Sequence, residues 1–152
     1  SCSDLFFIII GPIFPEQMVN ANKLEKIYSN IKFLGKKDYQ VLPYYMNTFD
    51  VCLIPFKVNE LTNGVNPVKV YEYAASGKPV VSTYLPEREK YQDTIYLAKD
   101  YKEFVEFIYK SIYGKPDVEK LLAMAEENTW DSQTNKMLNL FNQYISLKTN
   151  IE

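Results

Sequence analysis

The stretch that decides the fold runs NPVKVYEYAASGKPVV, from Asn66 to Val81. Asn66 is a good helix N-cap and Pro67 suits the first helical position, so we expect a helix over about 67–76. Gly77 fits the left-handed residue that ends many helices, and the β-branched run after it predicts a buried strand. The stretch therefore predicts one complete helix followed directly by a strand.

The start of this helix has the chemistry of an anion site. Backbone N–H groups at a helix start attract anions, and Lys69 adds a positive charge there. Glu72 lies three residues on, on nearly the same helix face, so the pair suits a phosphate and a ribose together. The alternative is that these residues have a structural role only. Asn-Pro is common at helix starts, and a surface ion pair of Lys69 with Glu72 would contribute on the order of a few tenths of a kcal/mol to stability.

The composition indicates one globular domain with no strong attraction to a polyanion. The chain has 152 residues, of which 47% are hydrophobic and 15% aromatic, enough for a buried core. Its net charge of −2 provides no field that would draw it to nucleic acid or to an anionic membrane. We therefore expect a single domain over residues 1–152 and no nucleic-acid partner.

The apolar runs and the cysteines predict the cellular compartment of the protein. The run Leu5–Ile10 is too short to span a bilayer, and no signal-peptide pattern is present. The chain has two cysteines, Cys2 and Cys52, and Cys52 lies in an apolar strand pattern, so we expect a core thiol rather than a disulfide framework. A reducing, cytoplasmic compartment fits these features.

Missing residue types exclude several chemistries. The chain has no histidine, so Ser-His-Asp triads, Cys-His pairs and histidine-bound metals cannot be built from it. It has no Asp-x-Asp pair for a metal-held diphosphate, and neither the phosphate-loop pattern nor G-x-G-x-x-G occurs. We therefore expect none of these triad, histidine–metal or phosphate-loop sites, and we expect no cofactor.

Continuous apolar runs alternate with helical patterns along the chain. Strands are predicted at Leu5–Ile10, Ile31–Gly35, Val51–Pro55, Pro79–Thr83 and Thr94–Ala98. From Tyr101 the pattern is helical to the end, and the charged segment 87–90 is expected to be a loop. This alternation predicts the α/β class, with a doubly wound parallel sheet covered on both faces.

Ligands of such sheets bind at the carboxyl ends of the strands. In this chain those ends carry Gly11, Gly35-Lys36, Pro55-Phe56 and the polar loop 57–65. Each of these is consistent with an ordinary turn, and as a set they predict a ligand site along this edge.

Five pieces of the chain, in order, resemble the C-terminal, donor-binding domain of GT-B glycosyltransferases of the family 4 (group 1) type. The pieces are FIIIG at 7–11, IKFLG at 31–35, FDVCLIPF at 49–56, the stretch 66–81, and Trp130 with the long helix after it. The resemblance implies a Rossmann-like sheet, the C-terminal half of a GT-B fold, closed by C-terminal helices.

The resemblance also implies a function. A family member moves a sugar from a nucleotide-diphosphate donor to an acceptor, without a metal and with a retaining outcome, often in surface polysaccharide assembly. Glu72 matches the residue that holds the ribose hydroxyls, and the N–H groups of Val68 and Lys69 match those that hold the diphosphate. The loop at Gly35 and Lys36 matches the contact with the base.

One departure concerns the sugar. The family pattern has a second glutamate eight residues before the one that Glu72 matches, and this chain has Gly64 there. Asn63 and Asn66 are the candidates to replace it, so the sugar contact and the retaining outcome stay open.

The other departure concerns extent. The family has an N-terminal acceptor domain and one more strand–loop–helix, which would supply the central strand of the sheet. We therefore expect a truncated piece of a longer enzyme, inactive or nearly so alone. Exposed apolar surface and open strand edges predict that the piece self-associates, and peripheral membrane association of the longer protein stays open.

Two other functions stay open. Gly64 favours a non-catalytic α/β interaction module with a degenerate donor site. A GT-B relative that epimerises a nucleotide sugar ranks last, because such enzymes rely on histidine and this chain has none.

Overall fold

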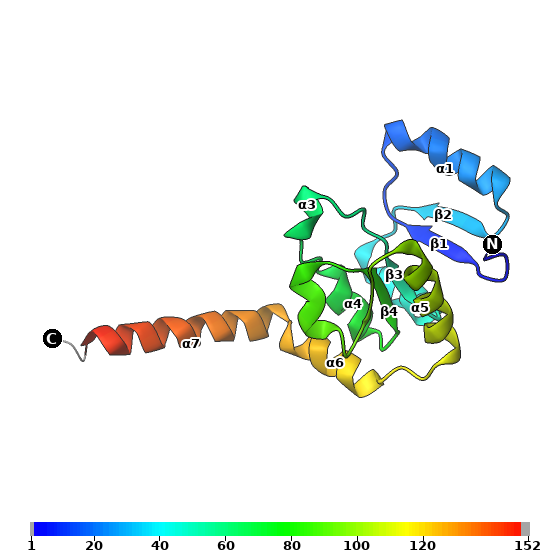
Figure 1. Cartoon of the computed structure of the whole chain (residues 1–152). Helices are drawn as coiled ribbons and strands as arrows, with labels where there is room; N and C mark the ends of the chain where they lie inside the picture. The colour runs from blue at the N-terminus through cyan, green and yellow to red at the C-terminus, as the bar shows by residue number, and fades with distance from the viewer. Residues whose placement is uncertain (1, 150–152) are drawn as a thin grey trace. The chain divides into compact units, whose positions relative to one another are not determined.

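The computed structural model describes residues 2–149, without the side chains at 61, 63 and 149. The chain divides into two compact units, Ser1–Tyr45 and Met46–Glu152 (Figure 1). Every strand pair in both units is parallel, and strands alternate with helices, which confirms the predicted α/β class.

The first unit is built on two strands. β1 (Phe7–Ile10) pairs in parallel with β2 (Ile31–Gly35), and α1 (Pro15–Ile27) connects them. A short 3-10 helix, η1 (Tyr39–Val41), leads into α2 (Leu42–Asn47), which reaches the boundary with the second unit.

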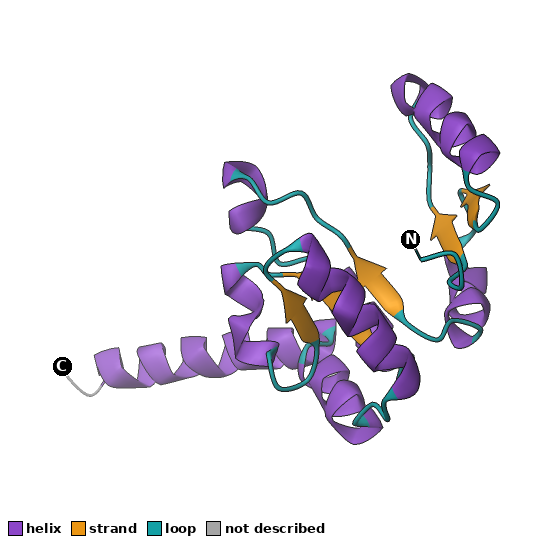
Figure 2. Ribbon diagram, turned by 45° about the vertical axis from the view of Figure 1, so that its right-hand side comes forward, coloured by secondary structure: helices purple, strands orange, loops and turns teal. Residues whose placement is uncertain are grey.

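The second unit is a three-stranded parallel sheet with helices around it (Figure 2). The strands, in their order across the sheet, are β3 (Cys52–Ile54), β4 (Val80–Thr83) and β5 (Tyr96–Ala98). The helices, in chain order, are α3 (Glu60–Asn63), α4 (Lys69–Ala75), the 3-10 helix η2 (Pro86–Tyr91), α5 (Tyr101–Tyr113), α6 (Val118–Glu127) and α7 (Trp130–Thr149).

The sequence predicts one doubly wound sheet, whereas the described strands form two. β1 pairs with β2 in the first unit, and β3, β4 and β5 pair in the second. The family resemblance predicts one further strand at the centre of a doubly wound sheet. Within residues 2–149, β1 and β3 therefore each keep one edge without a neighbouring strand.

The core of the second unit lies between the sheet and the helices α4 and α6. Val70 and Ala74, four residues apart on one face of α4, pack with Val80 of β4 and Leu121 of α6, and all four are at most 1% exposed. Val81 is fully buried on the opposite face of β4, where α5 packs. The sheet is therefore covered on both faces at β4, as predicted.

Cys52 in β3 is a core residue, as the sequence predicts. Its side chain is 3% exposed, and burial raises the pKa of its thiol to about 11. The thiol therefore stays protonated near neutral pH and is a poor nucleophile.

The helix of the 66–81 stretch starts later than the sequence predicts. Its N-cap is Val68, in helical conformation, and no side chain caps it. The predicted cap, Asn66, instead directs its side-chain amide to the Tyr71 hydroxyl at 3.0 Å. The predicted end is confirmed, because Gly77 has φ +68° and donates its N–H to the helix at 2.9 Å.

The segment 57–65, predicted to be a loop, contains the short helix α3. Asn59 accepts a bond from the N–H of Thr62 at 2.9 Å, and the Thr62 hydroxyl accepts one from the N–H of Asn59 at 2.8 Å. This reciprocal capping box stabilises a single helical turn. The turn ends at Gly64, whose φ of −93° is open to any residue.

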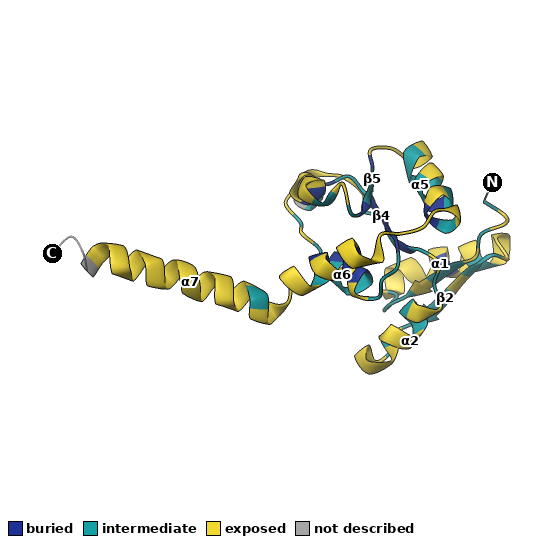
Figure 3. Cartoon of the chain, turned by 90° about the horizontal axis from the view of Figure 1, so that it is seen from below, coloured by how far each residue is buried: buried dark blue, intermediate teal, exposed yellow. Residues whose placement is uncertain are grey.

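α7 is exposed along nearly all of its length (Figure 3), and one half of it is apolar. Its large apolar side chains are 46–80% exposed and comprise Trp130, Met137, Leu138, Leu140, Phe141, Tyr144, Ile145 and Leu147. Successive helical residues turn by about 100°, so these side chains share one half of the helix, opposite Asn139. No helix within residues 2–149 has both the length and the apolar character that crossing a bilayer requires.

We expect the 152-residue chain to self-associate through this apolar half of α7. Phe141→Asp should shift the mass measured by light scattering toward the monomer, because it places a charge in the centre of the apolar half. Asn139→Asp, on the opposite half, is the matched control and should leave the mass unchanged. A wild-type chain that is monomeric at high micromolar concentration would contradict this prediction.

Candidate functional site

The first turn of α4 presents two open backbone donors. The N–H groups of Val70, Tyr71 and Glu72 bond to the carbonyls of Pro67 and Val68 at 3.0–3.3 Å. The N–H groups of Val68 and Lys69 have no acceptor among the residues that the structure describes. These are the two donors that the sequence assigns to an anion.

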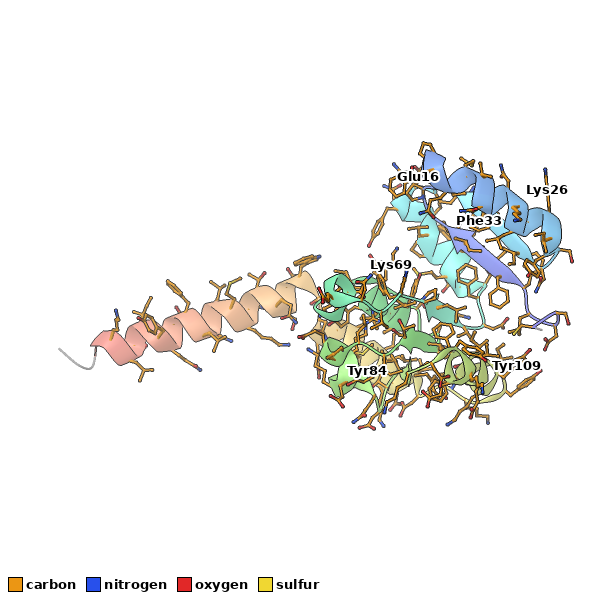
Figure 4. The ribbon with its side chains drawn as sticks, turned by 45° about the horizontal axis from the view of Figure 1, so that its top comes forward. Glu16, Lys26, Phe33, Lys69, Tyr84 and Tyr109 are labelled. Atoms are coloured by element: carbon orange, nitrogen blue, oxygen red, sulfur yellow. The ribbon has the colours of Figure 1, made fainter. Side chains whose placement is uncertain are left out.

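Lys69 and Glu72 lie on this same turn. Lys69 is exposed at the start of α4 (Figure 4), and its amine makes no ion pair within the described part of the chain. The alternative of a surface ion pair with Glu72 is therefore not formed. Glu72 is half-buried, and its helix is anchored in the core by Val70 and Ala74, which fixes the backbone from which its side chain projects.

A buried cation lies at the carboxyl ends of the neighbouring strands β3 and β4. Arg88, the single arginine of the chain, is fully buried on η2. One guanidinium nitrogen, Nη1, donates to the Ser82 hydroxyl on β4, and the guanidinium lies 5.7 Å from the ring centroid of Phe56, just after β3. Burial lowers the pKa of Arg88 to about 10, so it stays charged at neutral pH.

The charge of Arg88 is not compensated in the described structure. Its Nε and Nη2 atoms are buried without a hydrogen-bond partner, and no described carboxylate oxygen lies within 4.0 Å of the guanidinium. Such a group usually pairs with an anion, because a buried charge without a partner is costly. The second unit therefore holds the cations Arg88 and Lys69 and, at the start of α4, two open N–H groups.

Arg88 is not among the predicted site residues, because it lies in the charged segment 87–90, which the sequence predicts to be a loop. A signal was present in the spacing. Leu85, Arg88 and Tyr91 are three residues apart, and the 3-10 helix η2 has three residues per turn, so the three share one face. That face points inward, because Leu85 and Arg88 are both 0% exposed.

The other predicted site residues lie in two places. Pro55, Gly64 and Asn66 are exposed in the second unit, Pro55 directly after β3 and the other two on the segment before α4. Gly35, with φ +66°, and the exposed Lys36 end β2 in the first unit, so their grouping with α4 stays a prediction. The side chain of Asn63 lies outside the described residues.

The first unit has a cavity of about 320 Å³ beside Gly11, at the carboxyl end of β1. Residues 11–14 of the loop between β1 and α1 and apolar side chains of β1, β2 and α1 form most of its lining, together with the amides of Gln17 and Asn20. None of its lining residues is charged, so this cavity lacks the cations that a diphosphate needs.

Comparison with known proteins places the chain in a family. The family described as Glycosyl transferases group 1 matches residues 2–112, about three quarters of the chain. The chain therefore belongs to the group 1 glycosyltransferases, and the resemblance drawn from its sequence is confirmed.

One curated protein with a similar sequence has a name that states a biosynthetic role. The chain is 34% identical over 89 residues to "Putative teichuronic acid biosynthesis glycosyltransferase TuaH" of Bacillus subtilis (strain 168). The matched region covers 59% of this chain and 22% of the length of that protein. The chain thus spans only a fraction of this relative.

Proposed function

We propose that the chain is the nucleotide-sugar-binding part of a glycosyltransferase that acts in surface polysaccharide synthesis. The observation that carries the proposal is the first turn of α4, where Lys69, Glu72 and two open N–H groups come together. Family membership supports it, because transfer from a nucleotide sugar needs a site for a diphosphate and a ribose.

In the proposed complex, Glu72 accepts hydrogen bonds from the two ribose hydroxyls. The N–H groups of Val68 and Lys69 bind the diphosphate, with the Lys69 amine and the buried Arg88 charge nearby. Gly35 and Lys36 contact the base, and Pro55 lines the site at the end of β3. The donor is a substrate, and we propose that no metal takes part.

These cations also have a part in the transfer step. The bond between the anomeric carbon of the sugar and the terminal phosphate oxygen breaks, and an acceptor oxygen bonds to that carbon as its hydroxyl loses a proton. Negative charge grows on the departing nucleoside diphosphate. Fixed positive groups stabilise this charge more in the transition state than in the ground state. We propose that the reaction takes place on the cytoplasmic side and that a further domain binds the acceptor. The 152-residue chain alone would then bind the donor without transferring its sugar.

Calorimetric titration of the chain with UDP, GDP and ADP and with their sugars tests the proposal. We expect one base to bind with micromolar to millimolar affinity, and Lys69→Ala to weaken it about three- to tenfold through loss of a charged contact. Lys115→Ala, an exposed lysine on the loop between α5 and α6, is the matched control. Absence of binding at millimolar concentration, or equal effects of the two variants, would contradict the proposal.

A second candidate function is a non-catalytic interaction module. It is favoured by Gly64, which leaves the position of the family's second glutamate without a side chain. This candidate predicts that no nucleotide sugar binds, so the same titrations separate it from the first.

A further inference from the structure

Arg88 keeps one edge of its guanidinium group without a partner in the described structure. Nη1 donates to the Ser82 hydroxyl, whereas Nε and Nη2 are buried and make no hydrogen bond with any described residue. In a guanidinium group, the N–H of Nε and one N–H of Nη2 are parallel and lie on the same edge of the plane. Such a pair is the fork with which arginine binds both oxygens of a carboxylate or a phosphate. The two donors that stay open are therefore those that suit an anion with two oxygens.

The surroundings of Arg88 favour an anion with a single charge. The guanidinium lies 5.7 Å from the ring centroid of Phe56, and Leu85, three residues before Arg88, is fully buried as well. No described carboxylate forms an ion pair with Arg88, so its charge is not neutralised. One carboxylate neutralises one guanidinium, whereas a diphosphate brings two charges and leaves one of them buried beside apolar side chains, which is costly. A carboxylate is therefore the ligand that fits this fork best.

Arg88 lies at the edge of the sheet where α4 begins. Its two neighbours belong to the carboxyl ends of strands, since Ser82 is in the last half of β4 and Phe56 follows β3. Tyr91, three residues after Arg88, has its hydroxyl 3.3 Å from the hydroxyl of Tyr71 on α4, so η2 and α4 are in contact. A nucleotide at the start of α4 and a group held by Arg88 can therefore be parts of one molecule.

The guanidinium of Arg88 is covered in part by a side chain that can move. Arg88 is 0% exposed, whereas Phe56 beside it is partly exposed. The Phe56 N–H lies 3.1 Å from the Thr83 hydroxyl oxygen, so the backbone of this residue is held in place. Partly exposed side chains change rotamer without unfolding of the backbone. Rotation of the Phe56 ring therefore uncovers Arg88 while the sheet stays intact.

We propose that Arg88 binds a carboxylate group through two parallel hydrogen bonds from Nε and Nη2. Two sources supply this chemical group: a sugar acid attached to the nucleotide donor, and a free carboxylate ion. The first source rests on the proposed function, and it gives Arg88 a part in specificity, because an acidic donor sugar is then preferred to a neutral one. The second source is independent of the proposed function.

The first test uses the single arginine of the chain as its own probe. Because Arg88 has no counterpart elsewhere in the sequence, one Nε–H cross-peak in a ¹⁵N–¹H spectrum of the wild-type chain reports on it directly. We expect sodium formate to shift this cross-peak until it saturates, because formate accepts both bonds of the fork. Sodium chloride at the same ionic strength is the matched control and should shift it less. Equal, unsaturated responses to the two salts would count against a free carboxylate at Arg88.

The second test compares donors that differ only in a carboxylate: UDP-glucuronate with UDP-glucose, and GDP-mannuronate with GDP-mannose. For the pair that binds, we expect the acidic donor to bind about tenfold more tightly in calorimetric titration, because its carboxylate gains charge-assisted hydrogen bonds. Arg88→Met should abolish this preference, and Arg88→Lys, which keeps the charge but not the fork, should retain only part of it. Lys115→Met, an exposed lysine changed in the same way, should leave the preference unchanged.

The results separate the two sources and the two proposals. A preference for the acidic donor that disappears in Arg88→Met assigns the carboxylate to the sugar, whereas a saturable formate shift without that preference assigns it to a free ion. If UDP, GDP or ADP binds but neither formate nor an acidic donor moves the Arg88 cross-peak, this inference is overturned alone. If formate binds but no nucleotide does, the proposed function is overturned alone.

Discussion

Replacing Glu72 with alanine is expected to weaken the binding of a nucleoside diphosphate about 10- to 100-fold, because hydrogen bonds to a charged group are lost. Glu72 projects from a helix whose other face is fixed in the core by Val70 and Ala74. The proposed function has the Glu72 carboxylate accept hydrogen bonds from both hydroxyls of a ribose. Isothermal titration calorimetry of the variant and the wild-type chain measures the difference.

A 2′-deoxyribonucleoside diphosphate identifies the cause of that loss. It lacks one of the two hydroxyls, so the effect of Glu72→Ala should be much smaller with it than with the ribonucleotide. Glu106→Ala, an exposed carboxylate on α5, is the matched control for the change in net charge. Equal losses with both nucleotides would assign Glu72 to folding of the site rather than to the ribose.

Replacing Arg88 with methionine is expected to raise the free energy of unfolding by about 1–3 kcal/mol, because two unsatisfied buried nitrogens are removed. Methionine has a similar length and packs well against an aromatic ring such as Phe56. Ser82 is not left without a partner, since its hydroxyl still donates to the Thr83 carbonyl at 2.7 Å. Urea denaturation measures this gain.

The same variant is expected to bind nucleoside diphosphate more weakly, so stability and affinity move in opposite directions. Arg88→Lys keeps the charge and is the matched control: it should retain more of the affinity and gain little stability. This combination would show that the buried charge is retained for an anion. A less stable Arg88→Met chain with unchanged affinity would assign Arg88 to packing alone.

The strands and their parallel pairing were predictable from the sequence, because each is a continuous apolar run between turn residues. The start of α4 was not predictable, although Asn66-Pro67 is a common sequence at helix starts. The preference of asparagine for the N-cap position is not realised here, because Asn66 directs its side-chain amide to the Tyr71 hydroxyl. α3 was missed because a single turn held by one capping box leaves no periodic pattern.

The candidate site was predictable only where its residues are close in sequence. Val68, Lys69 and Glu72 lie together on α4 because one helix carries all three. Hydrogen bonds between Tyr71 and Tyr91 and between Tyr91 and Asn128 join residues 20 and 37 positions apart, and no local sequence pattern predicts such partners. The burial of Arg88 was not predictable for the same reason, because it depends on contacts with residues of two strands that are distant in sequence.

The two units differ in how much side-chain surface they bury, and this has a consequence for any measurement of stability. Within residues 2–45, Ala21 is the single buried residue, whereas the second unit has a packed core around Val70 and Leu121. Heat or urea should therefore unfold the chain in two transitions rather than in one cooperative step. Amide hydrogens of β1 and β2 should exchange with solvent well before those of β4, and the gain expected for Arg88→Met belongs to the second transition.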